Sequence, residues 1–450
     1  MEFGKLALFG GEAEVKGDIP ENLFKWPIVT EEDEAAVLEV LRRGAMSGTE
    51  VTEKFEKEFA QWNGTKYAVG FCNGTLSLQA AMFACKLGIG DEMICPSKTY
   101  WASAIQTFSL GATVVFADIE KDSLCLDPND IERCIGPDTK AIMVVHYLAH
   151  PADMDAIMAV AKKHNLMVIE DVSHAQGGTY KGRKLGTIGD VAAMSLMSGK
   201  SFPTGEMGIL VTNNKEIYDR AIAYAHYDRN NSNYITTEEL KPYMGMPLGG
   251  IKGRVNQTCA AMGRVQLKYY DERCAEIRKA MNYFWDLLEG TSGIKAHRTN
   301  EAEGTTMGGW YAAHGLYNSE ELHGLSILKF CEALRAEGFP TYPGGNYPLH
   351  THPVFQSYIA PNMDKPLRIA FAKRDVRELD KDLKVCSSVE IFSVPWFKEF
   401  KPEYIEMYAN AVKKVVLDHE FLIDGNSDIK DVGGRWHFYV HKAEKKDDAK

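Results

Sequence analysis

The chain has 450 residues, of which 45% are hydrophobic and 25% charged, and it carries a formal net charge of −11. This length exceeds one ordinary hydrophobic core and predicts two structural domains, while the negative charge argues against nucleic acid as a partner because phosphates would be repelled. No apolar run is long enough to span a bilayer, and nine cysteines without a C-x-x-C pair favour reduced thiols in a cytoplasmic protein.

Four regions follow one another along the chain. Residues 1–30 are expected to be an N-terminal arm, because glycine and proline pairs interrupt regular structure there. Over residues 31–285, apolar strands alternate with helices, a pattern typical of a large domain built on a mainly parallel sheet. A smaller α+β domain is expected over residues 286–425, and residues 426–450 form a charged tail that we expect to be disordered.

The large domain is expected to contain seven strands. The predicted strands lie at residues 66–72, 92–96, 112–119, 141–148, 166–169, 191–197 and 208–212, and helices at 75–88, 153–165 and 256–288. Because neighbouring parallel strands end at the same edge of a sheet, residues that follow the strands are candidates for a ligand site.

A first candidate lies where the strand at 66–72 turns into the following helix. Asn73, Gly74 and Thr75 would present backbone N–H groups and the positive end of the helix dipole to an anion such as a phosphate. Glycine allows the backbone to approach closely, and threonine adds a hydroxyl donor. Ordinary helix capping would need only the asparagine or the threonine, so both interpretations remain open from these residues alone.

The segment from residue 168 to residue 208 carries the most informative chemistry. An apolar strand ends in Glu170 and Asp171, and a later apolar run delivers Lys200 into a loop of small residues. Pyridoxal phosphate requires a lysine that forms a Schiff base with its aldehyde and a carboxylate that keeps its ring nitrogen protonated. Taken singly, each residue is more often a surface lysine or a turn former.

Four short motifs in this segment fall in register with one known family. EDVSHAQG, YKGRKLGTIGD, SLMSGK and TGEMG resemble the active-site segment of the DegT/DnrJ/EryC1/StrS sugar aminotransferases, a branch of the fold-type I pyridoxal phosphate enzymes. The resemblance covers about residues 6–285 well and the smaller domain only loosely. It implies a mainly parallel seven-stranded sheet between helices, pyridoxal 5′-phosphate as cofactor, and Lys200 and Asp171 as the catalytic residues.

The resemblance also assigns the phosphate site. Gly74 and Thr75 correspond to the family's phosphate-binding turn, and Ser195 corresponds to the serine that completes it. Met207 departs from the pattern, because the family has a second glycine in its G-E-G-G motif. We expect this change to reshape only the turn.

Two further positions are assigned to the cofactor ring. Tyr100, in ICPSKTYWASA, falls on the family's aromatic residue that stacks on the pyridine, and Trp101 lies beside it. The competing interpretation is that both residues simply pack in the core. His174 corresponds to the family residue that hydrogen-bonds the ring hydroxyl, and a purely structural histidine is the alternative.

The segment GGIKGRVNQTCAAMGRVQL resembles a family motif whose asparagine reaches the cofactor phosphate of the neighbouring subunit, which implies a homodimer with shared active sites. This chain has Lys252 at that position, where an ammonium can still pair with a phosphate. Arg254 matches the family arginine, and His350 lies in a P-L-H segment like one near the family's substrate pocket. Arg254 and His350 are therefore predicted to contact substrate.

Two other motifs resemble known binding sites only superficially. Gly199, Lys200 and Ser201 imitate the end of a phosphate-binding loop, but the required earlier glycine is replaced by Met194. His350 and His352 stand two residues apart without a clear third ligand, so no metal site is expected.

These assignments predict an aminotransferase that moves an amino group from glutamate or glutamine to a keto sugar or keto cyclitol, free or linked to a nucleotide or phosphate. Lys200 would carry the cofactor and then move the proton between substrate and cofactor carbons. One alternative is a sugar dehydratase of the same family, but such members carry histidine in place of the lysine. Another is a regulator that binds the cofactor without turnover.

Overall fold

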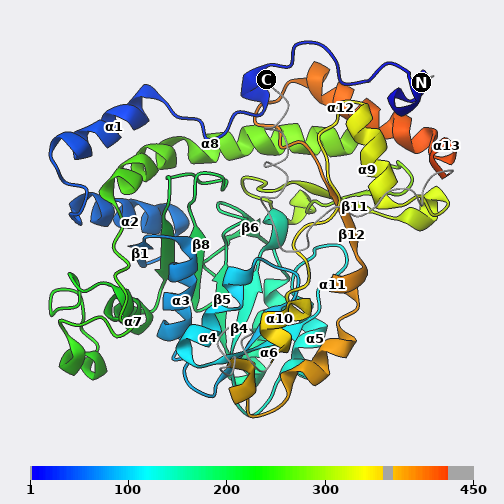
Figure 1. The fold of residues 1–450 in the computed structure, drawn as a ribbon. Helices are drawn as coiled ribbons and strands as arrows, with labels where there is room; N and C mark the ends of the chain where they lie inside the picture. The colour runs from blue at the N-terminus through cyan, green and yellow to red at the C-terminus, as the bar shows by residue number, and fades with distance from the viewer. Residues whose placement is uncertain (1–2, 358–367, 424–450) are drawn as a thin grey trace, which may run out of the picture.

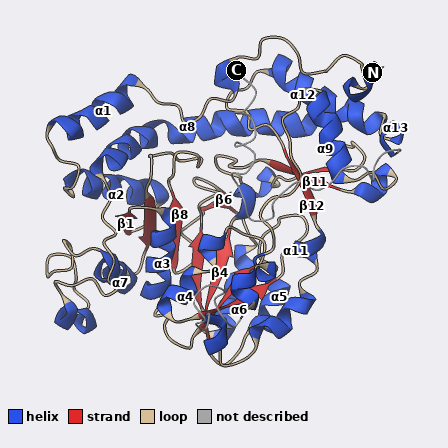
Figure 2. Cartoon of the chain, viewed as in Figure 1, coloured by secondary structure: helices blue, strands red, loops and turns tan. Residues whose placement is uncertain are grey.

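Seven strands form the central sheet of the computed structural model, which describes residues 3–357 and 368–423. They are β1 (Tyr67–Phe71), β2 (Glu92–Pro96), β3 (Thr113–Ala117), β4 (Thr139–Val145), β5 (Met167–Asp171), β8 (Val191–Ser195) and β9 (Gly208–Thr212). Their order is β1-β9-β8-β5-β4-β2-β3, and only β9 runs antiparallel to its neighbours. Figure 2 shows the strands in red among the blue helices. The predicted mainly parallel seven-stranded sheet is confirmed.

Helices pack around this sheet (Figure 1). They are α2 (Glu50–Asn63), α3 (Gly74–Ala84), α4 (Gln106–Leu110), α5 (Pro128–Cys134), α6 (Met154–His164) and α7 (Lys215–Ala225), whereas α1 (Glu31–Arg42) packs against the long helix α8 (Gln257–Leu287). The helix predicted over 75–88 ends early, because Lys86 adopts a left-handed backbone with φ of 62°. Each strand of the sheet is almost wholly buried, as strands covered on both faces must be.

One long helix joins the two parts of the molecule. Helix α8 (Gln257–Leu287) runs from α1 and α2 at one end to α12 (Pro402–Leu417) at the other (Figure 1). The side chain of Asn256 caps its start by accepting the N–H of Thr258 at 3.1 Å. The predicted helix over 256–288 is confirmed.

A second cluster of buried apolar side chains surrounds the C-terminal half of α8. Leu6 and Leu23 of the N-terminal arm are buried in this cluster, so the arm is packed against the protein. The predicted tail at 426–450 lies outside the described residues. The other elements of this part are β10 (Ile294–Ala296), β11 (His314–Tyr317) and β12 (Glu390–Ser393), which form an antiparallel sheet, α9 (Ile327–Ala336) and α13 (Glu420–Ile423).

Part of the expected small domain returns to the large sheet. Leu349, Val376 and Leu383 are buried in the first apolar cluster, together with the core of the sheet. This stretch contains α10 (Pro353–Gln356) and α11 (Val385–Ser388), and a hairpin of β6 (Thr179–Tyr180) and β7 (Arg183–Lys184) lies elsewhere on the large part. This stretch therefore belongs to the expected small domain by its position in the chain, but it packs in the core of the large part.

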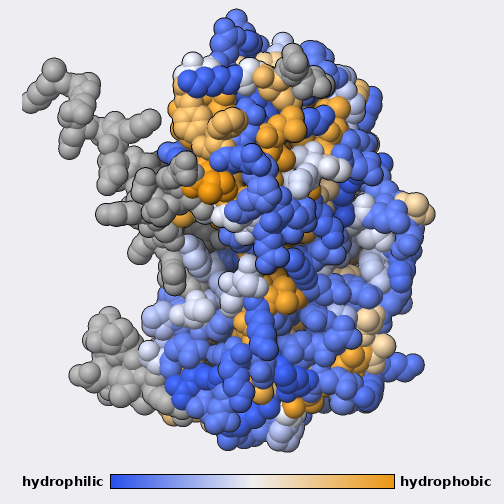
Figure 3. Space-filling view, turned by 90° about the vertical axis from the view of Figure 1, so that its right-hand side faces the viewer, coloured by the Kyte–Doolittle hydropathy of each residue, from blue (hydrophilic) through white to orange (hydrophobic). Residues whose placement is uncertain are grey.

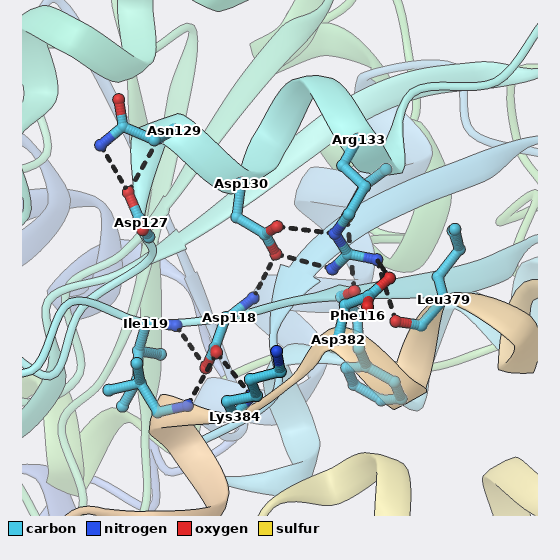
Figure 4. Close-up of polar contacts among 12 residues, drawn as sticks. Phe116, Asp118, Ile119, Asp127, Asn129, Asp130, Arg133, Leu379, Asp382 and Lys384 are labelled. Atoms are coloured by element: carbon cyan, nitrogen blue, oxygen red, sulfur yellow. Dashed lines mark hydrogen bonds and ion pairs between the residues drawn. The ribbon is translucent and has the colours of Figure 1, made fainter.

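A buried carboxylate fastens this returning stretch to the sheet (Figure 4). Asp118, which follows β3, accepts the backbone N–H groups of Lys384, Val385 and Cys386 at 2.8 Å each, and that of Ile119 at 2.9 Å. Burial favours the neutral acid, but these N–H groups outweigh it and hold the pKa of Asp118 below its usual range. The ionised carboxylate thus organises the start of α11.

Replacing Asp118 with asparagine should lower the free energy of unfolding by ~1–3 kcal/mol at pH 7, since an amide cannot replace a charged acceptor of four N–H groups. A lowered pKa in the folded state adds stability above the unfolded pKa, and this stability is lost as the pH falls through the folded value. The difference between the variant and the wild type should therefore shrink below about pH 4 in urea denaturation.

Asp127→Asn is the matched control. Asp127 accepts the N–H of Asn129 at 2.8 Å as the cap of α5 (Figure 4), and asparagine caps a helix as well as aspartate. A loss of stability equal in both variants would contradict the role given to Asp118.

On the face shown in Figure 3, polar side chains cover most of the lower part, and apolar side chains gather in the upper part. Within residues 3–357 and 368–423, no helix is both long and apolar enough to cross a membrane. All nine cysteines lie in these ranges, and each is a free thiol.

Candidate active site

Lys200 lies in the loop after β8, where aromatic side chains surround it. Its Nζ atom is 4.1 Å from the centre of the Tyr311 ring, and the indole N–H of Trp26 donates to its carbonyl oxygen at 2.8 Å. Burial lowers the pKa of Lys200 to about 8, against the opposing effect of the Asp171 charge. A neutral amine is therefore accessible near neutral pH.

Asp171 is the last residue of β5 and only 5% exposed. Its Oδ2 atom accepts the hydroxyl proton of Ser103 at 2.7 Å, and its Oδ1 atom accepts the N–H of Ser173 at 3.0 Å. Each oxygen therefore has one fixed partner, which orients the carboxylate at the carboxyl edge of the sheet.

Glu170 has a different environment, because successive side chains of a strand point to opposite faces. Its carboxylate is fully buried and accepts the N–H groups of Gly186, Ile188 and Gly189 at 2.6–2.9 Å. His146 lies 3.1 Å from it. Glu170 is thus occupied in holding the loop before β8, and Asp171 is the carboxylate left for chemistry.

The predicted phosphate turn opens α3. The side chain of Asn73 accepts the N–H of Leu76 at 2.8 Å, so the capping interpretation holds for the asparagine. The N–H groups of Gly74 and Thr75 belong to the first turn, where no intrahelical acceptor exists. A Cβ atom on Gly74 would lie 2.5 Å from the Cβ atom of Ser195. Only glycine therefore lets this turn and Ser195 share one site.

A series of hydrogen bonds connects Asp171, Ser195 and the loop that carries Lys200. Ser173, whose N–H binds Asp171, accepts the N–H of Ser195 through its own hydroxyl at 2.9 Å. Gln176 donates to the carbonyl of Ser195 at 2.6 Å and accepts the hydroxyl of Ser201 at the same distance. The loop after β5 therefore fixes both the end of β8 and the residue next to Lys200.

His174 lies between Tyr147 and Tyr311, with ring centres at 5.7 and 4.8 Å. Burial lowers its pKa well below the usual value, and the nearby Lys200 charge acts in the same direction. The ring is therefore neutral. Because its Nδ1 atom accepts the N–H of Leu148 at 3.3 Å, its proton is on Nε2, which can donate to an oxygen.

Tyr100 and Trp101 do not pack in the core. They are 39% and 40% exposed, and their ring centres are 4.8 Å apart. The carbonyl of Tyr100 accepts the N–H of Ser103, the residue that binds Asp171. The pair therefore lies on the loop that borders Asp171, and stacking of Tyr100 on a ligand remains a prediction.

Lys252 and Arg254 both lie against Tyr227. Both cations stand over the ring of Tyr227, at 5.4 and 5.6 Å from its centre, and Arg254 also pairs with Asp228 at 3.6 Å. The carbonyl of Gly253 between them accepts the N–H of Cys72 at 2.9 Å. The backbone of this segment therefore borders the end of β1. Contacts of Lys252 and Arg254 with ligands remain predictions.

His350 does reach the carboxyl edge of the sheet. Its Nδ1 atom is 2.7 Å from the hydroxyl of Ser97, which follows β2. His352 instead accepts the N–H of Val354 as the cap of α10. In the described ranges, a grouping of three potential metal ligands occurs only at residues His323, His419 and Glu420, and neither predicted histidine belongs to it.

Met207 adopts the position of the family's glycine without strain. Its side chain is fully buried, and its Cε atom would lie 2.8 Å from a Cβ atom on Gly70. Met207 is not among the described residues with positive φ, so its position does not require glycine. Its carbonyl accepts the N–H of Leu196 at 2.8 Å.

Sequence reasoning missed three residues of the site. Ser103 lies in a motif that was assigned to the ring only through Tyr100. Trp26 was interpreted as a break in the arm, and Tyr311 belongs to the loosely matched smaller domain. No spacing rule connects Trp26 or Tyr311 with Lys200, since each is more than 100 positions away along the chain.

A lysine and an aspartate at one edge of a mainly parallel seven-stranded sheet, beside a glycine turn at a helix start, are typical of fold-type I pyridoxal phosphate enzymes. The model of the DegT/DnrJ/EryC1/StrS aminotransferase family matches residues 27–373. The chain belongs to this family and is a pyridoxal phosphate-dependent aminotransferase.

Two curated relatives are similar over most of their length. L-glutamine:2-deoxy-scyllo-inosose aminotransferase from Streptoalloteichus tenebrarius is 35% identical over 69% of this chain and 73% of the relative. GDP-perosamine synthase from Escherichia coli O157:H7 is 35% identical over 67% and 78%, respectively.

Solved structures show the same fold. An aminotransferase from Psychrobacter cryohalolentis has a TM-score of 0.74 and 26% identity, and the similarity covers 88% of this chain and all of that one. DesV from S. venezuelae, in complex with a ketimine intermediate, has a TM-score of 0.67 and 29% identity over 86% and 94% of the two chains.

Proposed function

We propose that this aminotransferase moves an amino group from glutamate or glutamine to a keto sugar or keto cyclitol in the cytoplasm. The relatives named for a keto cyclitol and for an amino sugar support this acceptor class. The observation that carries the catalytic assignment is the position of Lys200, a half-buried lysine beside Tyr311 whose pKa is lowered to about 8 by desolvation, against the opposing effect of the Asp171 charge.

The side chains present fit pyridoxal phosphate. A phosphate suits the N–H groups of Gly74 and Thr75 with the hydroxyl of Ser195, because a side chain on Gly74 would fill that space. Asp171 suits the ring nitrogen, and the Nε2 proton of His174 suits the ring oxygen. The bound cofactor supplies an electron sink for the substrate carbanion.

The residues of this chain then have separate tasks. Lys200 would hold the cofactor at rest and, once the donor is bound, would take the proton from the donor carbon as a neutral amine, which burial makes available. The ammonium form of Lys200 would then carry this proton next to the electron-rich face of Tyr311, ready to return it. Ser103 and Ser173 hydrogen-bond the Asp171 carboxylate and fix its orientation.

Lys200 favours amino transfer over the dehydratase alternative, in which histidine takes the place of the lysine. Spectra separate transfer from passive binding. Adding glutamate or glutamine to the loaded protein should convert the pyridoxal absorption band into the pyridoxamine band, and a panel of keto sugars and keto cyclitols should restore it. Cofactor-loaded protein whose absorption spectrum does not change with either donor would contradict the proposal.

We further propose a homodimer in which Lys252 pairs with the cofactor phosphate of the partner subunit. Its exposed position above Tyr227 supports this assignment. An ammonium can bind phosphate as a point charge.

Lys252→Ala should then weaken cofactor retention, while mixed dimers with Lys200→Ala subunits should recover one working site. In such a mixed dimer, one active site contains an intact Lys200 and an intact Lys252, and the other active site contains both substitutions. Equilibrium dialysis of the cofactor and activity of mixed dimers measure the two effects. Lys241→Ala, at an exposed lysine paired with Glu238, is the control, and equal cofactor affinity in Lys252→Ala and wild type would refute the contact.

A further inference from the structure

Lys98 is a buried lysine that the reaction described above does not use. It follows β2 and Ser97, at the carboxyl edge of the sheet, and is only 5% exposed. Its Nζ atom donates to the backbone carbonyl of Asn346 at 3.2 Å. In the described part of the chain no carboxylate lies within ion-pair distance of it, and lysine is rarely buried in that way.

The acidic side chains of this edge are engaged elsewhere. Asp171 is held by Ser103 and Ser173, and Asp118 accepts four backbone N–H groups. Burial lowers the pKa of Lys98 to about 8, and only the distant influence of Cys386 opposes it. One of the three ammonium protons serves Asn346, so two remain for another acceptor.

A short series of contacts joins Lys98 to Lys200. Asn346, whose carbonyl binds Lys98, donates its N–H to the hydroxyl of Tyr147 at 2.9 Å. The ring of Tyr147 lies 5.7 Å from that of His174, which in turn lies 4.8 Å from Tyr311. Tyr311 is the ring beneath the Lys200 amine.

The loop that carries Lys98 also borders Asp171 and His350. Thr99 lies 3.3 Å from Ser103, the hydroxyl donor to Asp171, and Ser97 lies 2.7 Å from the ring of His350. Lys98 is therefore a cation that neighbouring side chains connect to the reacting lysine, on a loop that borders Asp171.

We infer that Lys98 binds an anionic substituent of a substrate, a carboxylate of the amino donor or a phosphate of the acceptor. Such a group would supply the missing counter-charge and accept the two remaining N–H bonds in a desolvated place, where charge-assisted hydrogen bonds are strong. The inference rests on the proposed function, because it takes the substrates to be an amino acid and a keto sugar or cyclitol.

The two half-reactions distinguish the sources of the anion. In Lys98→Met, the half-reaction with the amino donor (the donor arm) is followed spectroscopically with L-glutamate and L-glutamine. The half-reaction with the keto acceptor (the acceptor arm) is followed with keto cyclitols and keto sugars with and without a phosphate. We expect the apparent dissociation constant to rise ~10-fold or more in one arm, with the limiting rate changed less than about twofold. A rise in the donor arm identifies a carboxylate, and a rise only for phosphorylated acceptors identifies a phosphate.

Lys184→Met is the matched control, because Lys184 is a half-buried lysine on β7 that also donates to a backbone carbonyl, that of Trp62 at 2.6 Å. Lys98→Met should raise the melting temperature by a few degrees, since it removes a buried cation, whereas Lys184→Met should not. Calorimetry supplies a readout without turnover. Glutarate or inorganic phosphate should bind the loaded wild type and Lys184→Met, bind Lys98→Arg more weakly, and fail to bind Lys98→Met.

Equal binding of glutarate and phosphate by Lys98→Met and Lys184→Met, or equal losses for charged and neutral substrates, would overturn the inference. A wild type that reacts with neither amino donor would instead contradict the proposed function. The two failures are therefore distinguishable.

Discussion

Replacing Lys200 with alanine should abolish amino transfer, a loss of about 10⁴-fold or more, while the protein still folds and retains some cofactor without a covalent link. The amine is both the attachment point and the proton carrier, so no other group takes over its two tasks. Trp26 contacts Lys200 without depending on its side chain, because the indole N–H donates to the backbone carbonyl. Turnover with a labelled donor measures the loss, and the absorption spectrum reports the bound cofactor.

Lys181→Ala serves as the control for this variant. Lys181 lies in the neighbouring motif but is exposed and paired with Asp155 at 2.9 Å. Its replacement should leave turnover within about twofold, as expected for a surface salt bridge. Near-normal turnover in Lys200→Ala would contradict the whole assignment of the site.

Replacing Asp171 with asparagine should let the cofactor bind but lower the rate by about 10³-fold or more, the scale of a preorganised electrostatic group. An amide cannot keep the ring nitrogen protonated, so the electron sink is lost. Asparagine can still accept the N–H of Ser173 through its oxygen, and its amide N–H can donate to the hydroxyl of Ser103, which should preserve the loop. Single-turnover rates with glutamate measure the effect apart from binding.

Glu170→Gln separates the two adjacent carboxylates. Three backbone N–H groups point at Glu170, and an amide would place its own donors against some of them. This variant should lose ~1–3 kcal/mol of stability, while its folded fraction turns over at close to the normal rate. A large loss of rate in Glu170→Gln with only a few-fold loss in Asp171→Asn would show that Glu170, and not Asp171, is the carboxylate that faces the cofactor ring.

The sheet could be predicted from the sequence because strands buried on both faces appear as apolar runs, such as the one that ends at Asp171. The glycine turn at Gly74 and the lysine loop at Lys200 were predictable for a related reason. Their chemistry depends on local residue types at fixed spacing, which the sequence displays directly.

Other parts of the site depend on contacts between distant segments and left no local pattern. Tyr311 reaches Lys200 only because α8 carries the chain into the second part, and Lys98 appears in the sequence as an ordinary loop lysine. The return of residues near Leu383 to the large sheet was likewise not predictable, since it depends on the N–H groups that Asp118 collects across more than 250 positions.

The most direct test of the central claim is to find which residue carries the cofactor. Borohydride reduction of the loaded wild type, followed by digestion and mass spectrometry, should place the cofactor mass on the peptide that contains Lys200, and Lys200→Ala should give no such peptide. Cofactor fixed to a different lysine, such as Lys98 or Lys252, would contradict the account.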